Sequence, residues 1–381
     1  MSEKRICTAK TLKGLENVLA DELNAMGYSK VLKQRRAVQF EADIEGLYKA
    51  NLNLRTAMSV LWPLKSFKFR NKDDFFKQAR SIVWEDQFDV KKTFAVKTAV
   101  FSKVFTNTNY PALLVKDTVV DRFRNLLDKR PNVDKERPDV VIDVYVSDNE
   151  CTISLNSSGA PLFMRGYRNM PFTAPLNECL AAGMVYLSGW KANDNFLNPM
   201  CGSGTLIAEA AMMALNIHPQ KLRDDFAFKH WRNFDEAIFK KRREALLKDE
   251  LDSFNFKLQA SDISNRAISI TRNSLMVLGL EKYVDLSKMN VLKPKVDTKS
   301  GTVILNPPYD ERLKEEDIEE VYENMGSSLK LNYENHDAWI LSSHLEALKK
   351  VGLKTTAKID LFNGKIPCKF QGYELYSGSR K

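Results

Sequence analysis

The chain has 381 residues, of which 44% are hydrophobic and 28% charged, a composition typical of a globular protein with two or three domains. Its net charge of +9 is compatible with a nucleic-acid partner but does not require one. No apolar run is long enough to span a membrane, and the start MSEKRICTAK lacks the apolar core of a signal peptide, so we expect a cytoplasmic protein without a membrane partner.

The first 158 residues alternate between helical and strand patterns and contain no glycine-rich nucleotide loop, which indicates an α+β binding region. Apolar spacing predicts helices at residues 14–26, 44–54, 73–84 and 111–127. Alternating patterns predict strands at residues 30–42, 59–69 and 92–102 and a hairpin over 140–158. Pro63 lies within the second of these strands, where it indicates an edge or a bulge.

Four basic clusters lie in this region, and aromatic residues are interleaved in two of them. The clusters are KQRR at 33–36, KSFKFRNK at 65–72, KKTFAVK at 91–97 and RFRNLLDKR at 122–130. Such clusters suit phosphate contacts and base stacking, although solvated helix and strand faces give the same pattern. Together they favour RNA or DNA as the partner.

Ser, Gly and Pro accumulate over residues 157–175, as in a linker, and the pattern then changes to strands that alternate with helices. Helices are predicted at 177–190, 206–217, 266–279, 318–331 and 344–352. Strands are predicted at 256–262, 284–290, 302–306 and 336–343, and a short strand is predicted before the glycine turn. A final pair of strands is predicted at 355–364 and 369–377. This order predicts a doubly wound parallel sheet ending in an antiparallel pair, which is more typical of methyltransferases than of dehydrogenases.

The stretch NPMCGSGT at 198–205 predicts a strand, a glycine turn and a helix N-terminus that together face a ligand. Gly202 and Gly204 would allow close approach of the backbone. The pattern is not GxxxxGK[ST], which argues against a nucleoside triphosphate. Asp262, at the end of the next strand, is a candidate for ribose hydroxyls or, alternatively, for capping the helix that begins near residue 265.

The stretch NPPY at 306–309 follows a buried strand and forms a rigid corner at the same predicted edge. The side-chain oxygen of Asn306 and the carbonyl of Pro307 can accept hydrogen bonds from an exocyclic NH₂ group, and Tyr309 can stack on a flipped base. A rigid turn with a buried tyrosine is the alternative. Because the glycine turn and Asp262 are predicted at the same edge, we favour a catalytic role for NPPY over a purely structural turn.

The five cysteines and four histidines show no metal-binding or disulfide spacing, and no nucleophile with a partner base is readable. Transfer of a methyl group from a sulfonium cofactor needs none of these, because the cofactor carries the activated carbon. Three motifs together resemble those of the class I S-adenosylmethionine-dependent RNA methyltransferases with a THUMP domain. These motifs are NPMCGSGT, the SD at 261–262 and NPPYDERL. Among these methyltransferases, the chain is most similar to bacterial 23S ribosomal RNA guanine-N2 methyltransferases.

The resemblance covers nearly the whole chain, including RGYR at 165–168 and APLNECLAAGMVYLSGW at 174–190. It implies an α/β protein with a Rossmann-like methyltransferase domain and an N-terminal ferredoxin-like and THUMP unit. The implied boundaries are a ferredoxin-like subdomain at 1–55, a THUMP domain at 56–158, a linker at 159–175 and a catalytic domain at 176–381. No second, fused methyltransferase half is expected.

The resemblance also implies site residues, with S-adenosyl-L-methionine as the cofactor and no metal. The implied cofactor residues are Asn198, Pro199, Cys201, Gly202, Gly204, Thr205, Asp262 and Asn290, and the implied catalytic residues are Asn306, Pro307, Pro308 and Tyr309. Asn198 and Asn290 replace aspartates usual in the family. The candidates for RNA contact are Arg165, Arg168, Lys65, Lys68 and Arg70, and ion pairs that anchor the linker are the alternative for the two arginines of RGYR.

The leading hypothesis is methylation of the N2 amine of a guanosine in 23S ribosomal RNA. Transfer RNA is the alternative substrate, and a catalytically silent RNA-binding assembly factor is the alternative function. DNA adenine methyltransferases share NPPY, but the likeness of the N-terminal third to THUMP proteins argues against DNA. The oligomeric state is not predicted.

Overall fold

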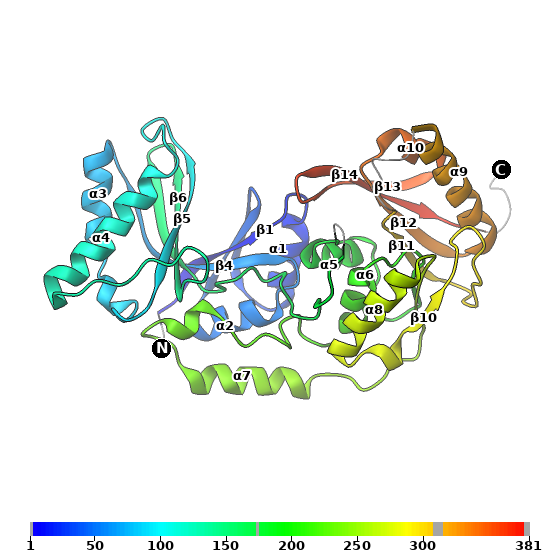
Figure 1. Ribbon diagram of the computed structural model, residues 1–381, viewed down its shortest axis with the longest axis horizontal. Helices are drawn as coiled ribbons and strands as arrows, with labels where there is room; N and C mark the ends of the chain where they lie inside the picture. Colours follow the sequence, from blue (N-terminus) through cyan, green and yellow to red (C-terminus); the bar gives the residue numbers. More distant parts are fainter. Residues whose placement is uncertain (1–2, 173–174, 308–314, 377–381) are drawn as a thin grey trace. The chain divides into compact units, whose positions relative to one another are not determined.

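The structure, a computed structural model, describes residues 3–172, 175–307 and 315–376 and divides into two compact units (Figure 1). The first unit contains Met1–Thr11, Ala20–Leu162 and Arg223–Glu244. The second contains Leu12–Leu19, Phe163–Leu222 and Ala245–Lys381. Each unit is therefore assembled from stretches that are separated in the sequence.

A seven-stranded sheet forms the centre of the first unit, in the order β2-β3-β1-β4-β7-β6-β5. Its strands are β1 (Arg5–Thr11), β2 (Ser29–Gln34), β3 (Ala37–Ala42), β4 (Ala57–Lys68), β5 (Phe94–Phe101), β6 (Val140–Ser147) and β7 (Glu150–Asn156). Only the β5–β6 pair is parallel. The sheet continues without a break across the boundary that the sequence suggests near residue 55.

Side-chain caps begin two helices of the first unit. Its helices include the second part of α1 (Glu16–Ala25), α2 (Ile44–Asn53), α3 (Lys72–Arg80) and α4 (Tyr110–Leu127). Asp43 accepts a hydrogen bond from Gly46 N at the start of α2, and Asn71 accepts one from Asp74 N at the start of α3. In Figure 1, α3 and α4 lie on the same side of β5 and β6.

The single strand predicted at 30–42 is wrong, because the structure divides it into the antiparallel strands β2 and β3. Arg36 has a φ of 57°, a left-handed conformation that reverses the chain direction. No glycine or asparagine occupies this turn, so the usual hairpin signal is missing from the sequence. By contrast, the bulge predicted at Pro63 is confirmed by a register shift between Pro63 and Lys65.

The segment 223–244 lies between strands of the second sheet in sequence but belongs to the first unit. It includes most of α7 (Glu236–Lys248). Its aromatic residues surround Tyr48 of α2, with ring centroids 4.6 Å from Phe228 and 5.7 Å from Phe239. The guanidinium group of Arg223 donates hydrogen bonds to the carbonyl oxygens of Ser158, Ala160 and Pro161. We call residues 223–244 the strap.

The second unit contains the predicted doubly wound sheet, in the order β10-β9-β8-β11-β12-β14-β13. Its strands are β8 (Phe196–Asn198), β9 (Leu258–Asp262), β10 (Asp285–Lys288), β11 (Gly301–Leu305), β12 (His336–Ser342), β13 (Thr355–Asn363) and β14 (Ile366–Glu374). β14 runs opposite to the other six strands, so it pairs antiparallel with both β12 and β13, and the remaining pairs are parallel. The predicted parallel sheet with a terminal antiparallel pair is confirmed.

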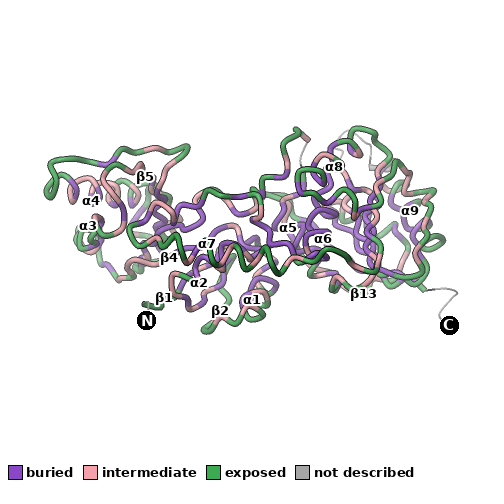
Figure 2. The backbone as a smooth tube through the Cα atoms, turned by 90° about the horizontal axis from the view of Figure 1, so that it is seen from below, coloured by how far each residue is buried: buried purple, intermediate pink, exposed green. Residues whose placement is uncertain are grey.

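Of the helices of the second unit, α5 precedes the first strand of the sheet and the others lie between strands, as the pattern predicted. These helices are α5 (Glu178–Leu187), α6 (Thr205–Ala214), α8 (Asn265–Leu278), α9 (Glu315–Asn332) and α10 (Leu345–Lys350). Figure 2 shows that α5 and α6 are largely buried, in agreement with their strongly apolar sequences. Among the described helices, none is long and apolar enough to cross a membrane.

Candidate functional site

Three neighbouring strands of the second sheet bring the predicted motifs to one edge. β8 pairs in parallel with β9 on one side and with β11 on the other, so the loops after these strands leave from the same edge. The glycine turn follows Asn198, Asp262 ends β9, and Asn306 follows the last residue of β11. The parallel topology therefore places motifs separated by more than a hundred residues side by side.

Hydrogen bonds join the glycine turn to the end of β9. Gly202 N donates to Asp262 Oδ2 over 3.0 Å, and Cys201 N donates to Ser261 O over 2.9 Å. Asp262 Oδ1 accepts from Ser264 N at 2.9 Å, whereas the cap of α8 is Ser264 itself. The capping alternative for Asp262 is thus wrong. Each carboxylate oxygen has a second lone pair, which can accept a hydrogen bond from a ribose hydroxyl.

The two glycines of the turn have different physical reasons for lacking a side chain. Both have a left-handed backbone, with φ of +55° at Gly202 and +79° at Gly204. A Cβ at Gly204 would lie 2.8 Å from Thr271 Cγ2 of α8, so this glycine is needed for close packing of the turn. A Cβ at Gly202 would approach only Phe172, at 3.6 Å, which is ordinary contact. Gly202 is therefore the glycine that suits a ligand.

Thr271 supports the turn, although no local sequence pattern indicates this role. Its hydroxyl donates to Gly202 O at 3.0 Å and lies 3.5 Å from Cys201 Sγ. Burial raises the pKa of the Cys201 thiol to about 12, so this cysteine is a neutral packing group and not a nucleophile. The predicted cofactor residue Thr205 is also buried, with its hydroxyl 3.1 Å from that of Ser203.

Asn198 and Asn290 lie at the ends of strands that border the turn. Asn198 is 1% exposed and donates from Nδ2 to Ile304 O of β11 at 2.8 Å. Its Oδ1 is buried and accepts no hydrogen bond from the described residues. Asn290 Oδ1 accepts from Leu292 N at 2.9 Å, and the preceding Met289 N donates to Asp262 O. Asn198 thus ties β8 to β11, and Asn290 stabilises the loop after β10.

Asn306 and Pro307 are the described part of the NPPY corner. Asn306 is half-buried and Pro307 is buried, directly after the fully buried β11. Pro308 and Tyr309, the other two predicted catalytic residues, lie outside the described residues. The stacking prediction for Tyr309 therefore stays a prediction.

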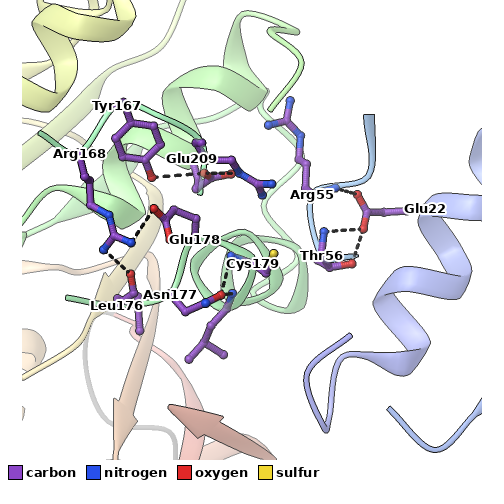
Figure 3. A network of polar contacts seen from close by, with 12 residues as sticks. Glu22, Arg55, Thr56, Tyr167, Arg168, Leu176, Asn177, Glu178, Cys179 and Glu209 are labelled. Carbon is purple, nitrogen blue, oxygen red and sulfur yellow. Dashed lines mark hydrogen bonds and ion pairs between the residues drawn. The ribbon is translucent and has the colours of Figure 1, made fainter. Parts of the chain in front are cut away.

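The RGYR segment at 165–168 forms buried ion pairs (Figure 3). Arg165 Nε lies 3.3 Å from Glu209 Oε1 of α6, and both side chains are fully buried. Arg168 lies 2.6 Å from Glu178 Oε1 and donates to Leu176 O. Burial raises the pKa of Glu178 to about 7, although Arg168 acts in the opposite direction.

These ion pairs correct one part of the predicted RNA interface. Arg165 is 1% exposed and cannot reach a phosphate in this conformation, so the alternative of a linker anchored by ion pairs holds for it. Arg168 is also held by a carboxylate, with 21% of its side chain exposed. The basic residue types suggested phosphate contact because a buried acidic partner on α6 is not visible from local spacing.

The basic cluster at 65–72 is partly available for RNA. Lys68 and Arg70 are exposed, with ion pairs at 3.1 Å to Glu150 and 3.5 Å to Asp74. Such exposed pairs are weak, contributing roughly 0–1 kcal/mol, and exchange readily for phosphate. Lys65, in contrast, donates to Gln78 O and Ser81 Oγ at the end of α3.

Two of the three aromatic residues interleaved in the clusters at 65–72 and 91–97 do not form the predicted stacking surface, whereas Phe67 is half-buried and packs on Phe75. Phe69 is 1% exposed and Phe94 is fully buried, so both belong to the core. The prediction of base stacking is wrong for these two residues. Among the described residues, no group of three or more His, Cys, Asp or Glu is arranged to hold a metal ion.

Comparison with protein families divides the chain into three matches. Residues 165–371 match the family model described as an RMKL-like methyltransferase domain. Residues 69–156 match the THUMP domain, and residues 7–61 match the RlmL ferredoxin-like domain. Together the three matches cover most of both units.

Curated proteins similar to the chain carry methyltransferase names. "Putative RNA methyltransferase slr0064" of Synechocystis is 31% identical over 97% of this chain and 96% of its own length. "Ribosomal RNA large subunit methyltransferase K/L" of Psychromonas ingrahamii is 35% identical over 96% of this chain. The match covers only 49% of that second protein, so the chain spans about half the length of the K/L relatives.

Solved structures share the complete arrangement of elements. One, described as "SMU.472, a putative methyltransferase complexed with SAH", covers 100% of both chains with a TM-score of 0.88 and 27% identity. A possible methylase from Clostridium difficile has a TM-score of 0.89 and 28% identity over both whole chains. TrmN from Thermus thermophilus, 16% identical with a TM-score of 0.73, shows similarity of fold alone.

Proposed function

The chain belongs to the family of RMKL-like methyltransferases, and from this premise we propose that it methylates the N2 amine of a guanosine in 23S ribosomal RNA. It is an RNA methyltransferase that depends on S-adenosyl-L-methionine. The finer proposal rests on the corner at Asn306 and on the likeness to ribosomal RNA methyltransferases. A ribosomal substrate would place its action in the cytoplasm.

The edge of the second sheet fits the cofactor. α6 has no side-chain cap, so the backbone N–H groups of its first turn can meet a polar ligand. The buried Oδ1 of Asn198 can accept a hydrogen bond from a ligand, and Gly202 leaves room for one to approach. A cavity of about 60 Å³ beside Asn198 and Ser261 is too small for a nucleoside, so the cofactor would lie across the strand ends.

The main catalytic role assigned to the protein is to align the methyl donor with the target amine. S-adenosyl-L-methionine supplies an activated methyl carbon, so no metal or strong base is needed. Asp262 would hold the ribose hydroxyls, and Asn290 would lie near the adenine. Asn306 Oδ1 and the Pro307 carbonyl would accept the two hydrogens of the target amine, which directs the nitrogen lone pair away from the corner. On the sequence, Pro308 would stiffen this corner and Tyr309 would stack on the flipped base.

RNA capture is assigned to the N-terminal stretches. We propose a ferredoxin-like subdomain at 1–55 and a THUMP domain at 56–158, followed by the linker at 159–175 and the catalytic domain at 176–381. Lys68 and Arg70 are exposed candidates for phosphate contact. Transfer RNA is the alternative substrate. A silent assembly factor is disfavoured because Gly202, Gly204 and Asn306 are all present.

Methyl transfer to defined RNA tests the proposal. The purified chain would be incubated with labelled cofactor and with ribosomal or transfer RNA from a strain lacking this gene, and modified nucleosides would be identified by mass spectrometry. We expect N2-methylguanosine in 23S ribosomal RNA. N6-methyladenosine, or label only in transfer RNA, would contradict the assignment of base or substrate.

Asn306→Ala separates catalysis from cofactor binding. Because Asn306 is assigned to the amine and not to the cofactor, we expect transfer to fall below detection while calorimetry shows nearly unchanged cofactor affinity. Equal loss of methyl transfer and of cofactor affinity would mean that the corner at Asn306 is structural. Asn332→Ala, on α9, is a matched control whose side-chain amide bonds, within the described part of the chain, only to Ser328 of its own helix, and we expect normal transfer.

A further inference from the structure

Two aromatic side chains lie exposed next to each other on the sheet of the first unit. Phe101 ends β5 and is 60% exposed, and Tyr145 of β6 is 45% exposed. Their ring centroids are 6.2 Å apart, with an angle of 55° between the ring planes. Large aromatic residues are usually buried, so an exposed adjacent pair indicates a binding surface.

The strand register shows that both rings belong to one face of the sheet. Ala99 pairs with Tyr145 and Phe101 pairs with Ser147, so residues two apart in each strand point the same way. The alternate residues of β6, among them Ile142, Val144 and Val146, are fully buried on the opposite face. The aromatic pair is thus exposed near the ends of β5 and β6, whereas Val141 and Asp143, farther along the same face of β6, are buried.

Backbone hydrogen bonds fix the strand ends that carry these rings. Asp148 N, in the turn between β6 and β7, donates to Phe101 O at 2.7 Å. The hydroxyl of Ser102 donates to Asp148 O. The end of β5 is therefore tied to the tip of the neighbouring hairpin, which reduces the entropy lost when the rings engage a ligand.

Lysines flank the pair on β5 and on the loop that follows it. Lys97 and Lys103 are exposed, and neither forms an ion pair with another described residue. Lys68 pairs with Glu150 across the exposed end of the same face, at 3.1 Å. Positive charge beside exposed rings suits a strand of nucleic acid, in which phosphates alternate with bases.

We propose that Phe101 and Tyr145 form a stacking platform for unpaired bases of the substrate RNA, with Lys97 and Lys103 on its phosphates. The inference deepens the proposed function, on which its choice of RNA rests. Two rings inclined to each other offer separate faces to successive bases. A double helix cannot use them, because its bases are already stacked on one another.

Binding of RNA to the full chain tests the platform. Fluorescence anisotropy would measure the affinity for a labelled single-stranded oligonucleotide of mixed sequence and for a duplex of the same composition. We expect Phe101→Ala and Tyr145→Ala each to weaken binding of the single strand by roughly tenfold, whereas Tyr145→Phe keeps the affinity. Leu113→Ala, an equally exposed residue of α4, is the matched control and should change nothing.

Salt dependence separates stacking from charge. Lys97→Ala should reduce the slope of log affinity against log salt by about one, and Phe101→Ala should leave that slope unchanged. The platform would be overturned if both alanine variants bound the single strand with unchanged affinity, or if they lost as much affinity for the duplex as for the single strand. It would also be overturned if the variants changed the oligomeric state without weakening RNA binding. If the wild-type chain methylates RNA and these variants bind normally, only this inference fails. If the platform binds RNA but no methyl group is transferred, only the proposed function fails.

Discussion

Replacing Gly204 by alanine tests the close contact between the glycine turn and α8. A Cβ at this position would lie 2.8 Å from Thr271 Cγ2 and 3.1 Å from its Cα, and backbone cannot move aside cheaply. The left-handed φ of +79° costs a residue with a side chain roughly 1–2 kcal/mol, and overpacking adds about 1–3 kcal/mol. We expect the free energy of unfolding to fall by roughly 2–5 kcal/mol.

Gly202→Ala is the matched variant in the same turn. Its Cβ would meet only Phe172 at 3.6 Å, so we expect just the conformational cost of roughly 1–2 kcal/mol. Since Gly202 is the position open to a ligand, the added methyl group should instead weaken cofactor binding. A loss of about 1.4 kcal/mol would appear as a tenfold weaker affinity.

Urea unfolding and calorimetry with S-adenosylhomocysteine would be carried out on both variants. We expect Gly204→Ala mainly to lower the free energy of unfolding. We expect Gly202→Ala mainly to weaken cofactor binding, with a smaller loss of stability. If Gly204→Ala is as stable as Gly202→Ala, the turn does not pack on α8 as described. If Gly202→Ala binds the cofactor normally, the turn does not face it.

Three further substitutions address buried groups of the second unit. Glu209→Gln leaves the buried Arg165 guanidinium without its counter-ion, and we expect urea unfolding to show a loss of about 3–5 kcal/mol. The pKa of Glu178 is raised from its ordinary 4.5 to about 7, so the folded state holds a proton that the unfolded chain has lost. Its contribution to stability should therefore decline as pH rises from 4.5 through about 7, and Glu178→Gln should remove this part of the pH dependence of unfolding. Gly326→Ala would place a Cβ against the carbonyl oxygen of Val351, which follows α10, and we expect a lowered melting temperature, whereas an unchanged one would refute close contact of α9 with the end of α10.

The sequence predicts the second unit better than the first. Strands that alternate with helices define a parallel sheet, and the parallel topology alone brings the glycine turn, Asp262 and Asn306 to one edge. The function of Thr271 could not be predicted, because its contact with Gly202 O depends on how α8 packs on the turn. Local spacing carries no information about such a contact.

The predicted base-stacking role of aromatic residues in the first unit was partly wrong for a related reason, because burial depends on packing between segments distant in sequence. Phe69 and Phe94 are neighbours of basic residues in the sequence, but both rings pack against other aromatic rings of the core: Phe69 on Phe75 and Phe105, and Phe94 on Phe88. Phe101 and Tyr145 lie in separate strands, and only the β5–β6 register reveals them as a pair. In the second unit, Arg165 was predicted to contact phosphate because its acidic partner Glu209 is distant in sequence.

The strap has a consequence for how the protein is made. Ribosomes release the amino-terminal end first, yet Phe228 and Phe239, which enclose Tyr48, emerge only after residues 163–222 have been synthesised. A nascent chain that ends before the strap leaves that ring uncovered and so remains open to chaperones and proteases. Gene fragments for expression should accordingly extend beyond residue 244, because truncation at the linker removes part of the first unit's own interior.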